Sequence, residues 1–188
     1  MVPANQDPQN EGVYYSTLYH NTQRYTLPDG TEAFVATISG DALILTKIAE
    51  GGQVIPEDNA VILKSNAQTI HMEQTDADPV TFSVTNDLRG SNSTVTNSGH
   101  MYVLSGADGV VGFYKLASGT DVPAYKAYIT LGSGIAGAPK KLRFVFNQAT
   151  GVESIQNSAI SIQKVIRNGQ VVILRNGVEF NVNGQKLK

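Results

Sequence analysis

Short runs in which apolar and polar residues alternate, bounded by Gly, Pro, Asn or Asp, recur along most of this chain. Successive side chains of a strand point to opposite faces, so this two-residue period is typical of strands with one buried face. In the run KKLRFVFN, for example, Leu142, Phe144 and Phe146 are expected on one face. Helical periodicity is scarce, and the sequence predicts an all-β protein. Further strands are expected near residues 13–19, 33–38, 42–48, 60–64, 69–73, 101–104, 110–116 and 126–131.

The middle of the chain contains one pattern twice. Residues 33–65 can be laid over residues 101–132 with one residue dropped near Gly52. In each copy a hairpin is followed by a proline and a third strand, and the proline marks a strand boundary because it cannot donate a ladder hydrogen bond. Neither unit can bury its apolar face alone, so we expect the two to pack together as a sandwich-like domain. The matched pairs are Val35/Val103, Lys47/Lys115, Ala49/Ala117, Gly51/Gly119, Pro56/Pro123, Ala60/Ala127 and Ile62/Ile129, with apolar pairs at Phe34/Tyr102 and Leu45/Phe113.

Segments of different composition flank and interrupt this repeated unit. Residues 1–12 carry two prolines and no hydrophobic periodicity, so they are interpreted as a flexible lead-in. The duplicated domain is expected to span residues 13–152. Within it, residues 85–99 are rich in Ser, Thr and Asn and are expected to form a surface loop between the copies. Residues 153–160 are interpreted as a linker.

Residues 161–188 form a separate tail in which a short sequence pattern repeats. The dipeptide Asn-Gly occurs at 168/169, 176/177 and 183/184, and it favours hairpins because both central positions of a type I′ turn need positive φ. The tail is therefore predicted to be a small β-meander. Such a meander has little core of its own, so it must dock on something or stay mobile, which makes it a candidate for recognition by a partner.

Composition narrows the classes of function. The chain has 188 residues, a net charge of −2 and a pI near 5.9, so it lacks the basic surface that nucleic-acid binding requires. It contains no cysteine, which excludes disulfides, thiolate metal ligands and thiol nucleophiles. Its longest apolar runs are far shorter than the roughly 20 residues of a membrane-spanning helix. Only 16% of its residues are charged, against about 25% in an average soluble domain, a balance common in extracellular β proteins and shared by many intracellular chains.

Catalytic and metal-binding residues are not expected. His20, His71 and His100 are scattered, and no serine lies in the elbow motif of a hydrolase. Asp76 and Asp78 could place carboxylate oxygens around a calcium ion, but the other positions of an EF-hand loop are missing. Ordinary surface acids in a turn are the favoured interpretation of that pair. No cofactor is expected.

Tyrosines gather near the start of the predicted domain. Tyr14, Tyr15, Tyr19 and Tyr25 are the candidate ligand contacts, since exposed aromatic rings stack on sugars and on apolar partner groups. The competing interpretation is that alternate members face the core, because Tyr15 and Tyr19 lie an even number of residues apart on a strand. We favour the core interpretation over ligand contact.

Several segments also resemble a known family. The resemblance is to a C-terminal β-rich module of secreted and surface-exposed proteins of Bacteroidales-type bacteria, including leucine-rich-repeat surface proteins. The tail KVIRNGQVVILRNGVEFNVNGQKLK is similar to the short terminal segment of those proteins, which is related in role to sorting tails. The other similar segments are TLY (17–19), VIPEDNAVILK (54–64), NDLRG (86–90), YVLSGADGVVGFYK (102–115), VPAYKAYI (122–129) and LRFVFNQATGVE (142–153).

The resemblance implies an extracellular or cell-surface setting and a non-catalytic module carried downstream of other domains of a parent protein. We expect the module to serve adhesion, display or anchoring, with a host protein, an envelope protein or a glycan as its partner. A carbohydrate-binding module is the alternative. A hydrolase is the third class, and it would require a deep pocket that gathers at least two titratable groups.

Overall fold

The protein is nearly all β, and the prediction of an all-β, sandwich-like fold is confirmed. It divides into two compact units, Met1–Gln148 and Ala149–Lys188, which are described separately below. The structure is a computed structural model. It describes residues 1–132 and 138–147, together with the backbone of residues 162–167, 170–175 and 178–180.

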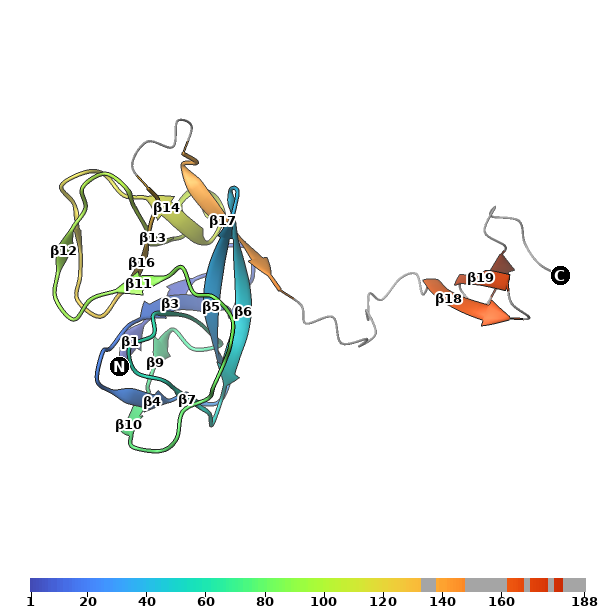
Figure 1. Ribbon diagram of the computed structural model, residues 1–188, viewed down its shortest axis with the longest axis horizontal. Helices are drawn as coiled ribbons and strands as arrows, with labels where there is room; N and C mark the ends of the chain where they lie inside the picture. Colours follow the sequence, from blue (N-terminus) through green and yellow to red (C-terminus); the bar gives the residue numbers. More distant parts are fainter. Residues whose placement is uncertain (133–137, 148–161, 168–169, 176–177, 181–188) are drawn as a thin grey trace. The chain divides into compact units, whose positions relative to one another are not determined.

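A ten-stranded sheet dominates the first unit (Figure 1), with strand order β11-β16-β13-β14-β17-β6-β5-β8-β3-β2. All of its neighbouring strands are antiparallel except β17 and β6. The strands are β2 (Asn5–Gln6), β3 (Tyr14–Leu18), β5 (Thr31–Ser39), β6 (Ala42–Glu50), β8 (Val61–Ser65), β11 (Arg89–Gly90), β13 (Met101–Ser105), β14 (Gly112–Lys115), β16 (Ala127–Thr130) and β17 (Lys141–Phe146).

Three small sheets accompany the large one. Their strands have two or three residues each, so each small sheet joins loops through a few backbone hydrogen bonds. A short 3-10 turn, Ala107–Gly109, lies between β13 and β14. The small sheets pair β1 (Val2–Pro3) with β9 (Thr69–Ile70), β4 (Arg24–Thr26) with β7 (Val54–Ile55) and β10 (Glu73–Thr75), and β12 (Val95–Thr96) with β15 (Asp121–Val122).

The sequence repeat is a structural repeat with the same strand register. In the first copy β5 forms a hairpin with β6 and also pairs with β8, where Phe34 lies opposite Ile62. In the second copy β13 forms a hairpin with β14 and also pairs with β16, where Tyr102 lies opposite Ile129. These four residues are the aligned positions of the sequence repeat. The duplicated hairpin-strand unit is therefore present in space as the alignment predicts.

The repeated unit is larger than the sequence alignment indicates. In the first copy β3 pairs with β8 and β4 with β7, and in the second copy β11 pairs with β16 and β12 with β15. Each copy thus contains six strands with one connectivity. The second copy takes two of these strands from residues 85–99, which were expected to form a surface loop. That expectation is wrong for this segment, because it is paired through β11 and β12 and buries Leu88 and Asn97.

Asn97 shows why a polar segment can be structural. Backbone hydrogen bonds place it at the position that Leu27 occupies in the first copy: the N–H of Gly52 donates to the Leu27 carbonyl at 2.9 Å. In the second copy the N–H of Gly119 donates to the Asn97 carbonyl at 2.8 Å. The buried Asn97 amide is fully bonded, as burial of a polar group requires. It donates to the carbonyls of Leu116 and Ala117 and accepts from the N–H groups of Gly99, His100 and Met101.

Strand β17 joins the two copies. It lies between β14 of the second copy and β6 of the first, as Figure 1 shows. Leu142 faces Phe113 across the antiparallel pair with β14, and Phe144 faces Leu43 across the parallel pair with β6. Without β17, both hairpins would present an open edge of unpaired backbone groups at this place.

The opposite ends of the ten-stranded sheet also meet. The N–H of Tyr19, just after β3, donates to the Tyr125 carbonyl at 3.0 Å, and the N–H of Ala127 donates to Thr17 Oγ1 at 3.1 Å. Gly90 of β11 lies against the Tyr19 ring so closely that any Cβ at this position would clash with it. We call this junction of β3 with the second copy the seam.

Two hydrophobic cores lie on opposite faces of the first copy. The main core gathers side chains of both copies and of β17, and the smaller core lies between the first copy and the short strands over it. Strand β8 contributes to both, because Ile62 faces the main core while Val61 and Leu63 face the smaller one. This double burial explains why the strand is a continuous apolar run rather than an alternation.

The first twelve residues differ from the flexible lead-in that was expected. Val2 is buried in the smaller core, and β1 pairs with β9 over it. Strand β2 then extends the large sheet beside β3. The prolines did not prevent pairing because Pro3 lies in a two-stranded sheet, where one side of a strand needs no donor.

The second unit contains an antiparallel sheet of three strands, in the order β18-β19-β20. Its strands follow one another along the chain, β18 (Ile162–Arg167), β19 (Gln170–Arg175) and β20 (Val178–Phe180), which is the order of a meander. The linker expected over residues 153–160 and the three Asn-Gly pairs lie outside the described residues.

Leu142 tests the joining role of β17. Its side chain is fully buried, so Leu142→Ala is expected to lower the free energy of unfolding by about 2–5 kcal/mol through lost burial and a residual cavity. Val145 on the same strand is 41% exposed, and Val145→Ala is the matched control, expected to cost less than about 1 kcal/mol. Urea unfolding measures both. Equal effects of the two substitutions would contradict the assignment.

Candidate functional site

The four candidate tyrosines have different environments. Tyr15 is 4% exposed and packs in the main core, with its ring centroid 5.6 Å from that of Phe144. Burial, aided by the charges of Asp7 and Glu32, raises the pKa of Tyr15 to about 12. Tyr14 is partly exposed at the start of β3. The structure therefore places Tyr15 in the core, where the favoured interpretation put it, and not on a ligand surface.

Tyr19 is a seam residue. Its hydroxyl donates a hydrogen bond to Asp58 Oδ1 at 2.7 Å, and that bond is the main cause of the raised pKa of Tyr19. Its backbone N–H bonds to the Tyr125 carbonyl, as described above. Tyr19 thus ties a loop of each copy to the end of β3. Its hydroxyl and ring already have structural partners.

Tyr25 belongs to a cluster of aromatic rings. His20 stacks on Tyr125, with centroids 5.2 Å apart and planes 9° from parallel, and the Tyr25 ring meets His20 edge-on at 6.0 Å. The Tyr25 hydroxyl donates to Gln23 Oε1 at 2.6 Å. These rings line a groove of approximately 410 Å³. We call it the aromatic groove; its lining includes His20, Gln23, Tyr25, Met72 and Tyr125.

Tyr125 is held in the groove by an uncommon backbone conformation. Its φ is 65°, in the left-handed region that side chains other than Gly, Asn and Asp rarely adopt. Asp58, at the same repeat position, has a φ of 55°. Both residues donate a backbone hydrogen bond to the strand-end loop of their own copy, Asp58 to His20 and Tyr125 to Ser91. The fold imposes this kink in both copies, and in the second copy the kink presents a tyrosine that is 46% exposed.

Sequence reasoning missed His20 and Tyr125 as groove residues. They lie more than 100 positions apart, so no local pattern joins them. One signal was available in the alignment of the two copies: Tyr125 stands where the first copy has Asp58, a residue type that tolerates positive φ. A bulky aromatic residue at a position of that kind points to a function for its side chain.

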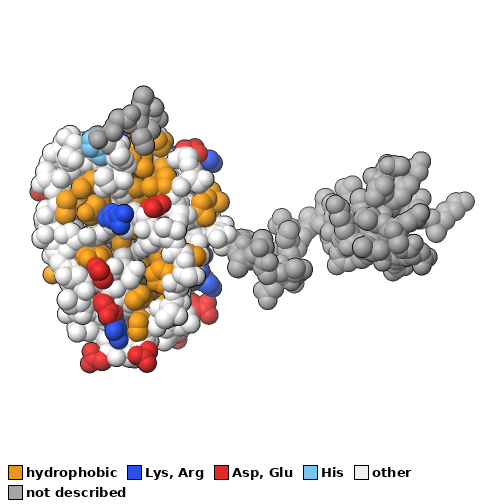
Figure 2. Space-filling view, viewed as in Figure 1, with side chains coloured by type: hydrophobic (Ala, Val, Ile, Leu, Met, Phe, Trp, Pro, Cys, Tyr) orange, Lys and Arg blue, Asp and Glu red, His pale blue; other side chains and the backbone are white. Residues whose placement is uncertain are grey.

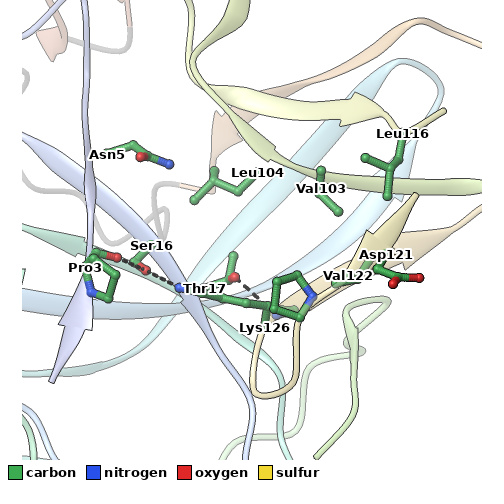
Figure 3. A pocket seen from close by; sticks show the side chains of 12 residues that line it. Pro3, Asn5, Ser16, Thr17, Val103, Leu104, Leu116, Asp121, Val122 and Lys126 are labelled. Atoms are coloured by element: carbon green, nitrogen blue, oxygen red, sulfur yellow. Dashed lines mark hydrogen bonds between the residues drawn. The ribbon is translucent and has the colours of Figure 1, made fainter. Parts of the chain in front are cut away.

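The seam groove is a second cavity, of approximately 330 Å³ (Figure 3). The N-terminal segment and β3 contribute Pro3, Asn5, Ser16 and Thr17 to its lining. The second copy contributes most of the apolar side chains together with Asp121 and Lys126. Lys126 extends across it toward Ser16, and Asp121 lies at the far end, as the close view shows. The polar group is Asn5, Ser16, Thr17 and Lys126; the apolar group is Val103, Leu104, Leu116 and Val122.

Charges are scattered over the face seen in Figure 2, where acidic and basic side chains are interspersed with apolar ones. One partly exposed ion pair is well formed: the Arg24 guanidinium contacts Glu57 through two hydrogen bonds of 2.5 and 2.9 Å, and holds the pKa of that carboxyl at about 2. No helix in the described part of the chain has the length and apolar character that a membrane crossing demands.

Asp76 and Asp78 lie beside this ion pair. The guanidinium of Arg24 donates to the carbonyl of Ala77, between the two acids, and their charges add to the raised pKa of Arg24. Among the described residues, no group of three or more His, Asp or Glu side chains is placed to hold a metal ion. The positive charge near this acidic pair is that of the Arg24 guanidinium.

Tyr15 generates a prediction for alkaline pH. A raised pKa means that the neutral phenol stabilises the folded state fully below pH 10, and that this contribution disappears as the pH rises through about 12. In an ultraviolet titration, Tyr15→Phe should remove the phenol that ionises last, while Tyr14→Phe should leave that late step in place. Loss of the late step in the Tyr14 variant alone would contradict the burial of Tyr15.

Comparison with known proteins gives no match. No family model, no curated protein and no solved structure matches this chain.

Proposed function

We propose that this chain is a non-catalytic recognition module of a larger extracellular or cell-surface protein, serving adhesion, display or anchoring, and that it binds its partner at the aromatic groove. The observation that carries this proposal is the exposed ring of Tyr125, fixed by a left-handed backbone and backed by His20. An exposed tyrosine on a rigid support offers a large contact area at a small cost in side-chain entropy.

The remaining lining of the aromatic groove suits recognition. Met72 is an adaptable apolar side chain that packs against partners of varied shape. Gln23 accepts the Tyr25 hydroxyl through its amide oxygen, so its amide nitrogen can donate to a ligand. The groove therefore combines a flat aromatic surface, a flexible apolar wall and an amide donor. Interfaces between proteins use the same combination of aromatic, methionine and polar groups.

A carbohydrate is the second candidate ligand. The near-parallel stack of His20 on Tyr125 favours it, because a ring held flat at a groove can receive the apolar face of a sugar. The Gln23 amide and His20 Nε2 would then bond the hydroxyl groups around the sugar, since His20 Nδ1 already accepts the N–H of Thr22. This version differs from the protein-binding version in its partner and uses the same residues.

The second unit supports the idea of a module within a parent protein. Residues 149–188 form a compact unit of their own, separate from the unit that contains both grooves. A transport or attachment machinery can bind this small sheet without disturbing the unit that contains the grooves. We propose that the tail serves surface delivery of the parent protein.

Removing the tail tests this division. Both hydrophobic cores, as far as the structure describes them, consist of residues before Gln148. Deletion of residues 149–188 should therefore leave the thermal unfolding of the first unit within a few degrees of the intact chain, while surface delivery of a full-length parent falls. Calorimetry and surface labelling measure the two effects. If the truncated chain does not fold, the tail is core structure and its delivery role loses its physical basis.

Tyr125 tests the recognition role. The intact chain is offered to cell envelopes, extracellular-matrix proteins and a glycan array, and Tyr125→Ala is expected to weaken the binding that is found by about tenfold or more, as loss of an interface anchor does. Tyr14→Ala is the matched control, since Tyr14 is partly exposed outside the groove. Binding to none of these partners, or equal loss in both variants, would refute the proposal.

A further inference from the structure

The seam groove carries a separation of polar and apolar groups that the recognition role does not use. At one end lie the Asn5 amide and the buried hydroxyl groups of Ser16 and Thr17, and Thr17 Oγ1 already accepts the N–H of Ala127 at 3.1 Å. Toward the other end, the side chains of Val103, Leu104, Leu116 and Val122 form an apolar wall. A ligand that fits both ends needs a polar head and an apolar tail.

Lys126 supplies the only charge at the polar end of this groove, as far as the structure describes it. Its aliphatic stem crosses the groove, and its Nζ donates to Ser16 Oγ at 3.3 Å. The Ser16 hydroxyl is itself committed as a donor to the Pro3 carbonyl at 2.7 Å. Lys126 is half-buried, and this burial lowers the pKa of its amine. Removal from water disfavours the ammonium charge, so a bound anion would compensate it.

No carboxylate in the described part of the chain provides that compensation. The ion pairs of the structure involve Arg24, Lys47, Lys64 and Arg143, and none includes Lys126. Asp121 lines the same groove, but it lies at the opposite end and accepts a hydrogen bond from Thr96 Oγ1 at 2.7 Å. Its negative charge repels an anion from that end, which orients an anionic head toward Lys126.

We propose that the seam groove binds a monocarboxylate with an unbranched apolar tail, that is, a medium-chain fatty acid. The carboxylate contacts the Lys126 ammonium, with the Asn5 amide as a second donor, and the tail lies along Val103, Leu104 and Leu116. The site is independent of the aromatic groove, and it adds a small-molecule ligand to the proposed recognition function.

The size and charge of the groove favour this ligand over others. A volume of approximately 330 Å³ is at the lower end of the range of about 300–1,000 Å³ for small-molecule sites, which suits a short lipid and not a phospholipid. One lysine matches one carboxylate, whereas phosphate recognition commonly uses an Arg fork or several donors. Each methylene that enters the apolar end should strengthen binding by about fourfold until the groove is full.

Calorimetric titration of the full chain with octanoate tests the proposal. Octanoate is expected to bind at least tenfold more tightly than octanol, which lacks the charge, and than octylamine, which reverses it. Acetate, which lacks the tail, is expected to bind too weakly to detect. Equal affinity for octanoate and octanol would show an uncharged apolar groove, and detectable acetate binding would show a simple anion site; either result overturns the proposal.

Substitution of Lys126 assigns the effect to the groove. Lys126→Met keeps the stem and removes the charge, so octanoate affinity should fall at least tenfold while octanol affinity stays within about twofold. Lys126→Arg should keep the preference for octanoate. Lys115→Met is the matched control, because Lys115 is exposed outside the seam groove, and it should change nothing.

The comparison of octanoate, octanol, octylamine and acetate on the unsubstituted chain tests the proposal even if a variant does not fold. Thermal unfolding of each variant without ligand separates loss of folding from loss of binding. Octanoate binding that survives unchanged in a folded Lys126→Met variant would overturn the assignment of the site. Failure of octanoate to bind would leave the aromatic groove untouched, because the Tyr125 test uses a different site and different ligands.

Discussion

The backbone pairing of β17 with two different strands is the interaction on which the rest of the structure depends. Strand β6 of the first copy and strand β14 of the second would each end the sheet of its own copy with an open edge. Strand β17 satisfies both edges at once, antiparallel to one and parallel to the other. Two units that share one connectivity become a single ten-stranded sheet, and their apolar faces enclose one main core.

The joining of the copies at β17 has a counterpart at the other end of the sheet. There β3 meets the second copy, and both grooves are lined partly by residues of that seam. Leu18 and Tyr125 share the aromatic groove, and Thr17 and Lys126 share the seam groove. Neither cavity exists within one copy. Duplication supplied the scaffold, and the junction between the copies supplied the surfaces on which a ligand can be bound.

Sequence patterns were sufficient for the local elements. The two-residue period and the aligned Phe34/Tyr102 and Ile62/Ile129 positions predicted the hairpins and their third strands, because these depend on neighbouring residues and turns. The insertion of β17 was not predictable, since its pairing is decided by open edges distant in the chain. Burial of Asn97 and pairing of the first six residues were missed for a similar reason: polar composition and prolines describe local preference, whereas tertiary hydrogen bonds decided the outcome.

Asp58 and Tyr125 share the left-handed backbone kink, but their side chains have different roles in the two copies. In the first copy the kink carries a carboxylate that bonds Tyr19 and so holds the fold. In the second copy only the backbone carbonyl of the kink is used for that purpose, by the N–H of Tyr19. Within the part of the chain that the structure describes, no hydrogen bond uses the Tyr125 side chain, so a different residue there would leave the bond from the Tyr19 N–H in place. A substitution at the kink of the second copy would therefore change the ligand specificity of the aromatic groove and leave the backbone fold unchanged.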